Sequence, residues 1–479
     1  MTKEKFYEII DHIGECIKGS IYETCLYAVG GCIRDLTMGN EIKDIDMCIE
    51  MPEGGIKFAE WMRERGFTKG SVVTYPTYGT AMFRLKKFPN EEIECVQTRG
   101  EQYHDKNSRN PQVQYSTLKE DCFRRDLTMN ALYMRVCDHE ILDLTGKGIQ
   151  DIKDTVARVT NDNPDVVFED DPLRILRVIR FAVKYNLYID DDTSKSMKKN
   201  GDRLSIITRE RITDEFSKMM VSPDPSRALD LMRYYGVMKY VVPEVEKMVG
   251  IEQNKYHFGD AWSHTSKVVN NLAWNSPIKV SHEWLLPVRI AGLLHDIGKI
   301  QTKTIDDNGN VHFFQHENVG AEMAKKIMVE MRYSTDETKM VEFLIKNHMR
   351  TKSWGDNADK AKQKSLNKLA YECKNFKALE ALMCLIDADN MAHKSEMCIK
   401  GQGVAVLSKV KNSIASKMFG YKLPINGDDV CRIMGIEPSP QVKLYLQHCL
   451  GLAFNNPDIT LEECEHHIKK DKIKGLKDT

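Results

Sequence analysis

The first apolar positions of the chain recur every three or four residues, which predicts an amphipathic helix over residues 5–17. Beyond it, short apolar runs separated by turn residues predict strands mixed with helices. These runs are residues 26–29, 45–49, 72–74, 80–85 and 93–97. Residues 101–116 are polar, and we expect a mobile loop there. From about residue 165 apolar residues repeat only at helical spacing. We therefore predict an α+β protein, with a small mixed-sheet head followed by a long all-helical body.

Length and charge narrow the classes of protein that fit this pattern. At 479 residues with 42% apolar content, the chain can form two to four domains. Its net charge of −1 argues against a strongly basic nucleic-acid coat, although a local basic face is compatible with it. The 13 cysteines are odd in number and contain no CxxC pair, which is typical of reduced thiols. The chain lacks an apolar run of about 18 residues and a signal-peptide pattern, so we expect a cytoplasmic protein with no membrane contact.

A glycine pair follows the first predicted strand, and two aspartates accompany the second. Gly30-Gly31 ends the run at 26–29, while Asp44 and Asp46 begin the run at 45–49. Side chains two apart on a strand point to one face, so both carboxylates can reach one metal cluster. Glycines let backbone N–H groups come close to a polyphosphate because no Cβ intervenes. These residues predict a site for a nucleoside triphosphate and its Mg²⁺.

Two-metal catalysis needs acidic oxygens that bridge Mg²⁺ ions about 3.5–4 Å apart. Asp44 and Asp46 suit that role. A third carboxylate often completes such a site from a neighbouring strand, and Glu94 is our candidate.

A second polar cluster begins at Arg124 and ends at Leu132. Leu127, Ala131 and Leu132 can pack inward on a helix, which leaves other side chains polar. Among these, a guanidinium suits a triphosphate, and a carboxylate or amide can hydrogen-bond ribose hydroxyls. The candidates are Arg125, Asp126 and Asn130.

An arginine row lies on a helix that Asp170-Asp171-Pro172 introduces and that is otherwise almost wholly apolar. Arg174, Arg177 and Arg180 share one face, which indicates buried or liganded arginines. Cytosine and adenine both present an amino donor beside a ring-nitrogen acceptor, whereas uracil and guanine present the reverse pair. A carboxylate from Asp171 and a guanidinium from Arg174 would accept C and A and reject U and G.

These motifs together resemble those of the tRNA nucleotidyltransferases, or CCA-adding enzymes, and bacterial poly(A) polymerases, a branch of the DNA polymerase beta superfamily. GGxxRD with DxD, RRDxxxNA and the arginine helix occur in the family's order over about residues 25–245. The resemblance implies a DNA-polymerase-beta-like head with Mg²⁺ at Asp44 and Asp46. It further implies ribose contact from Asp126, base reading by Asp171 and Arg174, and nucleotide contacts from Gly31, Arg34, Arg125 and Arg177.

One position departs from the family's pattern. The family usually has Glu-Asp before the arginine helix, whereas this chain has Asp170-Asp171, with Glu169 one place early. If the register shifted by one residue, Asp170 rather than Asp171 would read the base.

Positive charge is concentrated just after these motifs. Residues 174–211 contain ten Lys or Arg against five acids, in a protein of net charge −1. We place the phosphates of tRNA here, because a double-stranded stem is read by shape and backbone and one basic face suffices.

The helical body carries a second set of candidate ligands. Imidazoles and carboxylates on separate helices are what a divalent or binuclear metal site requires. The order resembles the HD-superfamily phosphohydrolases, which implies a phosphodiesterase or phosphatase with a divalent transition metal such as Ni²⁺, Mn²⁺ or Co²⁺. His312 is a nearby alternative to His316 as a metal ligand. The ligand set is His264, His295, Asp296, His316, His348 and Asp387.

The predicted organisation has four parts. A nucleotidyltransferase head spans 1–155, a nucleotide-selecting and RNA-binding neck 156–250, an HD domain 251–395 and a helical tail 396–479. Within the tail, Cys464, His466 and His467 could bind a metal, but no second pair accompanies them. We interpret this group as a solvated tail.

Our leading hypothesis is template-independent addition of C and A to the 3′ end of tRNA from CTP and ATP, with pyrophosphate released. A poly(A) polymerase, or an enzyme that adds only CC or only A, would use the same chemistry. A uridylyltransferase that modifies a regulatory protein also joins this head to an HD module, but such proteins are longer. The intact carboxylates of Asp44 and Asp46 and the intact HD ligands argue against a non-catalytic RNA-binding protein that has lost its activity.

Overall fold

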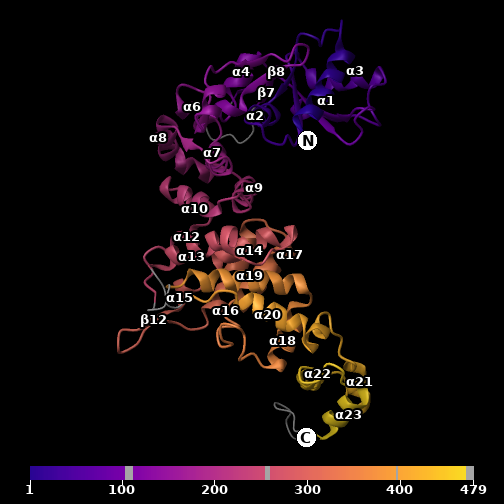
Figure 1. Ribbon diagram of the computed structural model, residues 1–479, viewed down its shortest axis with the longest axis vertical. Coiled ribbons are helices and arrows are strands. Elements are labelled where there is room, and N and C mark those ends of the chain that lie inside the picture. The colour runs from indigo at the N-terminus through magenta and orange to yellow at the C-terminus, as the bar shows by residue number, and fades with distance from the viewer. Residues whose placement is uncertain (103–111, 254–258, 395–397, 471–479) are drawn as a thin grey trace. The chain divides into compact units, whose positions relative to one another are not determined.

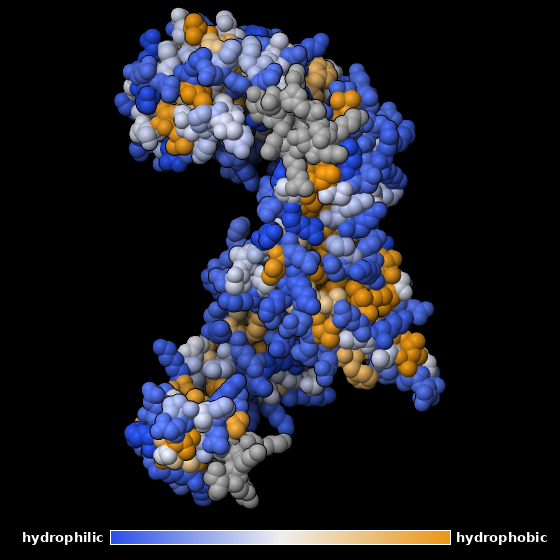
Figure 2. All heavy atoms as spheres, turned by 180° about the vertical axis from the view of Figure 1, so that it is seen from behind, coloured by the Kyte–Doolittle hydropathy of each residue, from blue (hydrophilic) through white to orange (hydrophobic). Residues whose placement is uncertain are grey.

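The computed structural model describes residues 1–102, 112–253, 259–394 and 398–470 (Figure 1). The chain forms two compact units, residues 1–241 and 242–479. No described helix is both long and apolar enough to cross a bilayer. On the face in Figure 2, hydrophilic residues cover most of the surface and apolar residues form small groups.

A seven-stranded sheet forms the head, in the order β3-β4-β5-β2-β1-β8-β9. β2 and β5 are parallel, while the other neighbours are antiparallel, so the mixed sheet predicted from the sequence is confirmed. The amphipathic helix is confirmed as well, because its apolar positions are all buried. The strands are β1 (Leu26–Val29), β2 (Ile45–Ile49), β3 (Val73–Tyr75), β4 (Thr80–Arg84), β5 (Glu92–Gln97), β8 (Leu132–Arg135) and β9 (Ile141–Asp143).

The polar stretch at 101–116 differs from the expected loop at both ends. β6 (Arg99–Gln102) and β7 (Gln112–Tyr115) pair antiparallel as a separate two-stranded sheet. The centre of the expected loop, residues 103–111, lies outside the described residues. The apolar pattern missed these strands because their residues are mostly polar.

Helices complete the first unit. The helix α7, which carries the arginine row, packs against α9 and α10. Its apolar side chains Ile175, Leu176, Val178 and Ile179 are fully buried. The helices are α1 (Lys3–Ile17), α2 (Gly31–Met38), α3 (Gly54–Glu64), α4 (Leu118–Phe123), α5 (Gly148–Lys153), α6 (Pro164–Asp170), α7 (Leu173–Lys184), α8 (Asp191–Asn200), α9 (Arg209–Met220), α10 (Pro225–Tyr234) and α11 (Met238–Val241).

The second unit is almost entirely helical, which confirms the predicted body. Its central helix α19 is apolar nearly all round and packs against α13, α14, α17, α18 and α20. The strands β12 (Lys303–Ile305) and β13 (Val311–Phe313) form a small hairpin. The helices are α12 (Pro243–Glu246), α13 (Ala261–Asn270), α14 (His282–Leu294), α15 (Lys299–Thr302), α16 (His316–Glu330), α17 (Thr335–Asn347), α18 (Gln363–Cys373), α19 (Phe376–Ala392) and α20 (Gln402–Lys411).

Three last helices, α21 (Gly427–Met434), α22 (Pro440–Ala453) and α23 (Leu461–Lys470), surround a small core of their own. Cys464 belongs to this core, and burial raises the pKa of its thiol. The interpretation of Cys464 as part of a solvated tail is therefore wrong. The neighbouring His466 is exposed, as expected.

Candidate active site and candidate metal centre

The glycine turn connects β1 to α2 at one edge of a cavity of about 1140 Å³ in the first unit. Gly30 has φ +75°, a left-handed conformation that glycine adopts without the steric cost of a Cβ. A Cβ there would lie 3.4 Å from Nη1 of Arg125. The turn thus lets the N-terminus of α2, which favours anions, line the cavity beside a guanidinium.

The three carboxylates predicted to hold Mg²⁺, Asp44, Asp46 and Glu94, all line the same cavity. Asp46 on β2 is in parallel register with Glu94 on β5, and Asp44 lies two residues earlier on the same side. Burial, together with the charges of Glu94 and Asp44, raises the pKa of Asp46 to about 6. A bound cation would remove this repulsion, so the donor set fits Mg²⁺.

Arg34 is buried and held in one orientation. Its Nε and Nη2 donate to the two carboxylate oxygens of Asp35 at 2.9 and 2.8 Å, and its Nη1 donates to Oδ1 of Asn130 at 2.7 Å. The hydroxyl of Tyr185 donates to Asp35 at 2.9 Å and its ring packs against the guanidinium. These contacts pre-organise a positive charge at the cavity wall.

Asp121 is a supporting residue that sequence reasoning missed. Its fully buried carboxylate accepts hydrogen bonds from Nη2 of Arg124 at 2.6 Å, Nη2 of Arg125 at 2.9 Å and the hydroxyl of Tyr133 at 2.6 Å. Burial opposes its ionisation, but the two guanidinium groups hold its pKa well below the ordinary range. Asp121 lies three residues before Arg124 and four before Arg125, a spacing that puts the side chains on one helical face. This spacing was the sequence signal that could have predicted the ion pairs.

Asp126 and Asn130 form a second buried pair. Nδ2 of Asn130 donates to Oδ1 of Asp126 at 3.0 Å, and Nε of Arg177 donates to Oδ2 of Asp126 at 2.8 Å. Arg177 and Arg180 both reach the buried Glu215, at 3.3 and 2.6 Å. Two of the three arginines in the row are therefore ion-paired, and the row is not a solvated helix face.

Asp171 lies just before α7, at the end of α6. Its Oδ1 accepts the N–H of Leu173 at 3.2 Å, and its Oδ2 accepts Nη2 of Arg211 at 2.7 Å. Arg174 is buried, and its Nη1 donates to the carbonyl of Val167 at 3.1 Å. Asp170, Asp171 and Arg174 all line the cavity, so the register between the two aspartates stays open.

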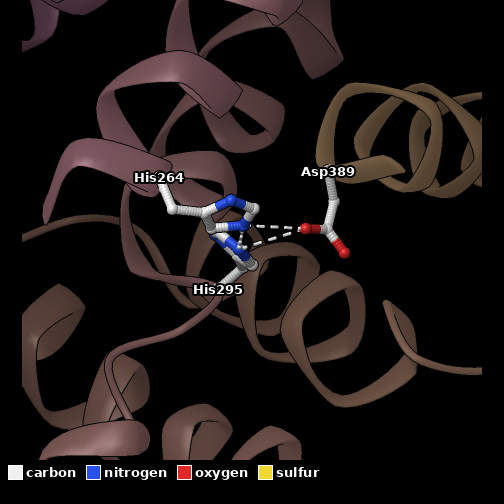
Figure 3. A group of neighbouring side chains, drawn as sticks. All are labelled: His264, His295 and Asp389. Atoms are coloured by element: carbon white, nitrogen blue, oxygen red, sulfur yellow. Dashed lines mark hydrogen bonds and ion pairs between the residues drawn. The ribbon is translucent and has the colours of Figure 1, made fainter. Parts of the chain in front are cut away.

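The second unit contains a group of three buried ligand-type side chains, drawn in Figure 3. His264 on α13, His295 after α14 and Asp389 on α19 point toward one another. Nε2 of His264 lies 2.9 Å from Oδ1 of Asp389 and 3.4 Å from Nε2 of His295. Two imidazoles and one carboxylate at these distances fit one divalent metal ion.

A further group consists of Asp296, His316 and His348. Nε2 of His316 lies 3.3 Å from both Oδ1 of Asp296 and Nε2 of His348. The other carboxylate oxygen of Asp296 lies 3.2 Å from Nε2 of His295, in the first group. Asp296 therefore stands between the two groups, where a carboxylate can bridge two ions.

Backbone contacts set the orientation of three of these imidazoles. Nδ1 of His295, His316 and His348 each lies within 2.9 Å of the carbonyl oxygen three residues earlier. Because a carbonyl only accepts, Nδ1 carries the proton and Nε2 presents its lone pair to the group. Burial, then the charge of His295, lowers the pKa of His348 to about 3, which keeps it in the neutral, metal-binding form.

Two lysines compensate the carboxylates of this centre. Nζ of Lys299 lies 2.6 Å from Oδ2 of Asp296 and also donates to Oε1 of Gln253 at 2.6 Å. Nζ of Lys352 lies 3.7 Å from Oδ2 of Asp389. Each buried carboxylate therefore has a positive partner within ion-pair distance.

The structure corrects one predicted ligand. Asp387 does not join the group, because its Oδ1 accepts the N–H of Gly403 at 2.6 Å near the start of α20. Residues two apart on a helix point about 200° apart, so only Asp389 faces the histidines. The rival His312 is excluded as well, since its Nε2 pairs with Asp306 at 3.0 Å.

Gly298 permits the close approach of the His295-Asp296 segment to α16. A Cβ at Gly298 would lie 2.1 Å from the carbonyl oxygen of His316 and 2.7 Å from the backbone nitrogen of Gly320. Any side chain here would push apart the residues of the second group.

Comparison with family models matches three consecutive parts of the chain. Residues 26–158 match the poly A polymerase head domain, and residues 186–248 match the probable RNA and SrmB-binding site of polymerase A. Residues 279–390 match the HD domain. The first match contains Asp44, Asp46 and Glu94, and the third contains all of the candidate metal ligands except His264.

Curated relatives cover most of the chain. The CC-adding tRNA nucleotidyltransferase of Thermus thermophilus is 25% identical over 422 residues, which cover 87% of this chain and 86% of that protein. The A-adding tRNA nucleotidyltransferase of Deinococcus radiodurans is 26% identical over 424 residues, covering 86% and 88%. Among solved structures, the Bacillus stearothermophilus CCA-adding enzyme in complex with CTP shares the fold, with a TM-score of 0.63 at 19% identity over 95% of this chain and 94% of that one.

Proposed function

Because this chain belongs to the family of tRNA nucleotidyltransferases and poly(A) polymerases, we propose that it adds C and A nucleotides to the 3′ end of tRNA, consuming CTP and ATP and releasing pyrophosphate. The observation that carries this proposal is one cavity in which three carboxylates, the glycine turn and several fixed arginines converge. A CC-adding and an A-adding relative match over most of the chain, which supports the proposal.

The reacting groups are assigned as follows. Asp44, Asp46 and Glu94 would hold Mg²⁺, which supplies positive charge to the attacking 3′-hydroxyl and the leaving pyrophosphate. The triphosphate lies against the glycine turn, Arg34 and Arg125. In-line displacement at the α-phosphate then follows from positioning and charge stabilisation.

Base selection is assigned to the segment around the start of α7. Asp171 accepts from the exocyclic amino group and Arg174 donates to the ring nitrogen, a pattern that C and A satisfy and U and G do not. Arg211 holds the Asp171 carboxylate in place at 2.7 Å. Asp126 contacts the ribose, with Asn130 and Arg177 fixing its orientation.

The test uses purified protein with tRNAs that lack the whole 3′ CCA, its last two nucleotides or only the terminal A, and with each nucleotide supplied singly. Sequential addition of two C and one A supports the proposal, whereas repeated A addition without C would indicate a poly(A) polymerase. Loss of C and A addition in Asp44→Ala is expected, and unchanged addition would overturn the assignment.

Partial activity is the second candidate, because two matched relatives are named CC-adding and A-adding enzymes. A CC-adding enzyme would stop after the second C, and an A-adding enzyme would accept only a tRNA that already ends in CC. Incorporation of UMP into a protein acceptor would instead support the uridylyltransferase reading.

For the HD centre we propose a metal-dependent phosphodiesterase or phosphatase that uses Ni²⁺, Mn²⁺ or Co²⁺. The two ligand groups joined by Asp296 support this activity. Hydrolysis of bis-p-nitrophenyl phosphate after metal removal and reloading with each ion tests it.

We also place the protein in the cytoplasm, since all thirteen cysteines, each among the described residues, are free thiols.

A further inference from the structure

A second cavity, of about 870 Å³, lies within the 242–479 unit. Its walls come from α16, α17, α18 and the turn at Gly420-Tyr421. None of the six metal-ligand candidates lines it, so it is separate from the HD centre. Its volume is in the range of small-molecule sites, about 300–1,000 Å³.

The cavity wall is strongly positive. Lys346, Lys368 and Lys374 are exposed at its rim, and Arg350 is half-buried beside them. Among the described residues, Glu372 supplies the one carboxylate that lines the cavity; it is paired with Arg350, and its Oε1 lies 4.0 Å from Nζ of Lys368. Three cations in excess, in a protein of net charge −1, favour a ligand with a phosphate group.

The remaining wall is aromatic. Phe343, Tyr371 and Tyr421 line the cavity and are all half-buried, so part of each ring stays accessible. Phe454 packs edge-to-face against Tyr371, with ring centroids 5.5 Å apart, and fixes that ring. Aromatic faces beside cations are the combination that binds a nucleobase and its phosphate.

The backbone of Lys374 has an unusual conformation. It ends α18 with φ +64°, the left-handed region that usually favours glycine. A lysine at this position keeps a cation at the cavity rim at the expense of backbone strain.

We propose that this cavity binds a ribonucleotide, with the phosphate against Lys346, Lys368 and Lys374 and the base against the aromatic wall. The ligand is either a free nucleoside monophosphate or one nucleotide of an RNA strand, which share this chemistry. Because stacking tolerates every base, the cavity takes guanine and uracil as readily as cytosine and adenine.

The experiment measures binding of GMP, of inorganic phosphate and of a single-stranded hexaribonucleotide to the full chain by isothermal titration calorimetry without divalent metal. The test variant is Lys346→Ala/Lys368→Ala/Lys374→Ala. The matched control is Lys279→Ala/Lys326→Ala/Lys411→Ala, which removes three exposed lysines of the same unit that do not line the cavity. Tyr421→Ala tests the aromatic wall.

We expect GMP to bind at least tenfold more tightly than phosphate, the test variant to weaken GMP binding at least tenfold, and the control to change it less than twofold. The KM for CTP in the test variant stays unchanged, which separates this cavity from the head. If only the hexanucleotide binds, and binding falls tenfold in the test variant, the nucleotide belongs to RNA.

Equal affinity of the native chain and the test variant for both nucleotide probes overturns the proposal. GMP that inhibits CTP addition with a constant equal to its Kd would lie in the head and also overturns it. Failure of nucleotide addition leaves this result unaffected, because the measured quantity is binding.

Discussion

Asp46 carries a charge that the folded protein disfavours when no cation is bound. Burial and the neighbouring carboxylates raise its pKa to about 6, above the ordinary value of about 3.9. Between these values the folded state holds more protons than the unfolded state, so stability falls as pH rises. We expect Asp46→Asn to raise the free energy of unfolding by about 1–2 kcal/mol at pH 8 and hardly at pH 4, while nucleotide addition falls at least about 100-fold.

Urea unfolding in EDTA at both pH values measures the stability effect, and CTP incorporation measures the loss of function. Asp44→Asn is the control, because Asp44 is exposed and should change stability less. A destabilised Asp46→Asn protein at pH 8 would contradict this account.

Asp121 is a residue of the opposite kind, since its charge is stabilised by its surroundings. Its pKa lies well below the ordinary range, so its contribution is present above about pH 3.9 and is lost as pH falls further. Asp121→Asn leaves Arg124 and Arg125 without their buried partner, and we expect a loss of about 3–5 kcal/mol. Denaturant unfolding at pH 7 measures it, with the surface variant Asp138→Asn expected within about 0.5 kcal/mol of the native chain.

At the scale of elements, we expect the segment that joins α6 to α7 to determine which bases enter. In Asp171→Asn the amide can donate to a carbonyl as well as accept, so we expect CTP and ATP incorporation to fall about tenfold to 100-fold and UTP incorporation to become measurable. Single-turnover assays with each nucleotide measure the ratio.

Asp170→Asn is the matched variant for that experiment, because Asp170 lines the same cavity. If Asp170→Asn relaxes base choice and Asp171→Asn does not, the register is shifted by one residue and the base-reading carboxylate is Asp170.

The contact between the His295-Asp296 segment and α16 depends on a glycine. Gly298→Ala places a Cβ 2.1 Å from the carbonyl of His316, and the backbone must separate to accept it. We expect at least a tenfold loss of metal affinity, measured by calorimetry, with CTP addition retained. Gly451→Ala is the control, since no atom lies within 4 Å of its added Cβ; equal metal affinity in both variants would contradict the prediction.

The same elements explain what sequence could and could not predict. The glycine turn and the Asp44-Asp46 pair can be predicted from local spacing. Strand geometry alone puts the side chains of Asp44 and Asp46 on one face. Asp389 could not be predicted from the sequence, because α19 is buried nearly all round and its apolar pattern gives no direction to the carboxylates of Asp387 and Asp389. The role of Asp121 could be predicted only in part, because Arg124 and Arg125 lie within one helical turn of it whereas its third partner, Tyr133, comes from β8, later in the chain.

At the scale of the whole molecule, the two candidate sites lie in different compact units, each with its own buried core. We expect Asp296→Ala to abolish phosphodiester hydrolysis while CTP and ATP addition stays within about twofold. Asp44→Ala should give the reverse. Paired assays on both variants measure the separation, and parallel loss of both activities in either variant would show that the sites depend on each other.

The lysines beside the HD carboxylates bear on the order of events when the protein is made. Two buried carboxylates without positive partners would oppose folding until metal ions arrived. Lys299 and Lys352 neutralise Asp296 and Asp389 within the chain itself. We therefore expect the unit to fold before a metal ion is bound, in contrast to zinc fingers, which stay unfolded without their ion.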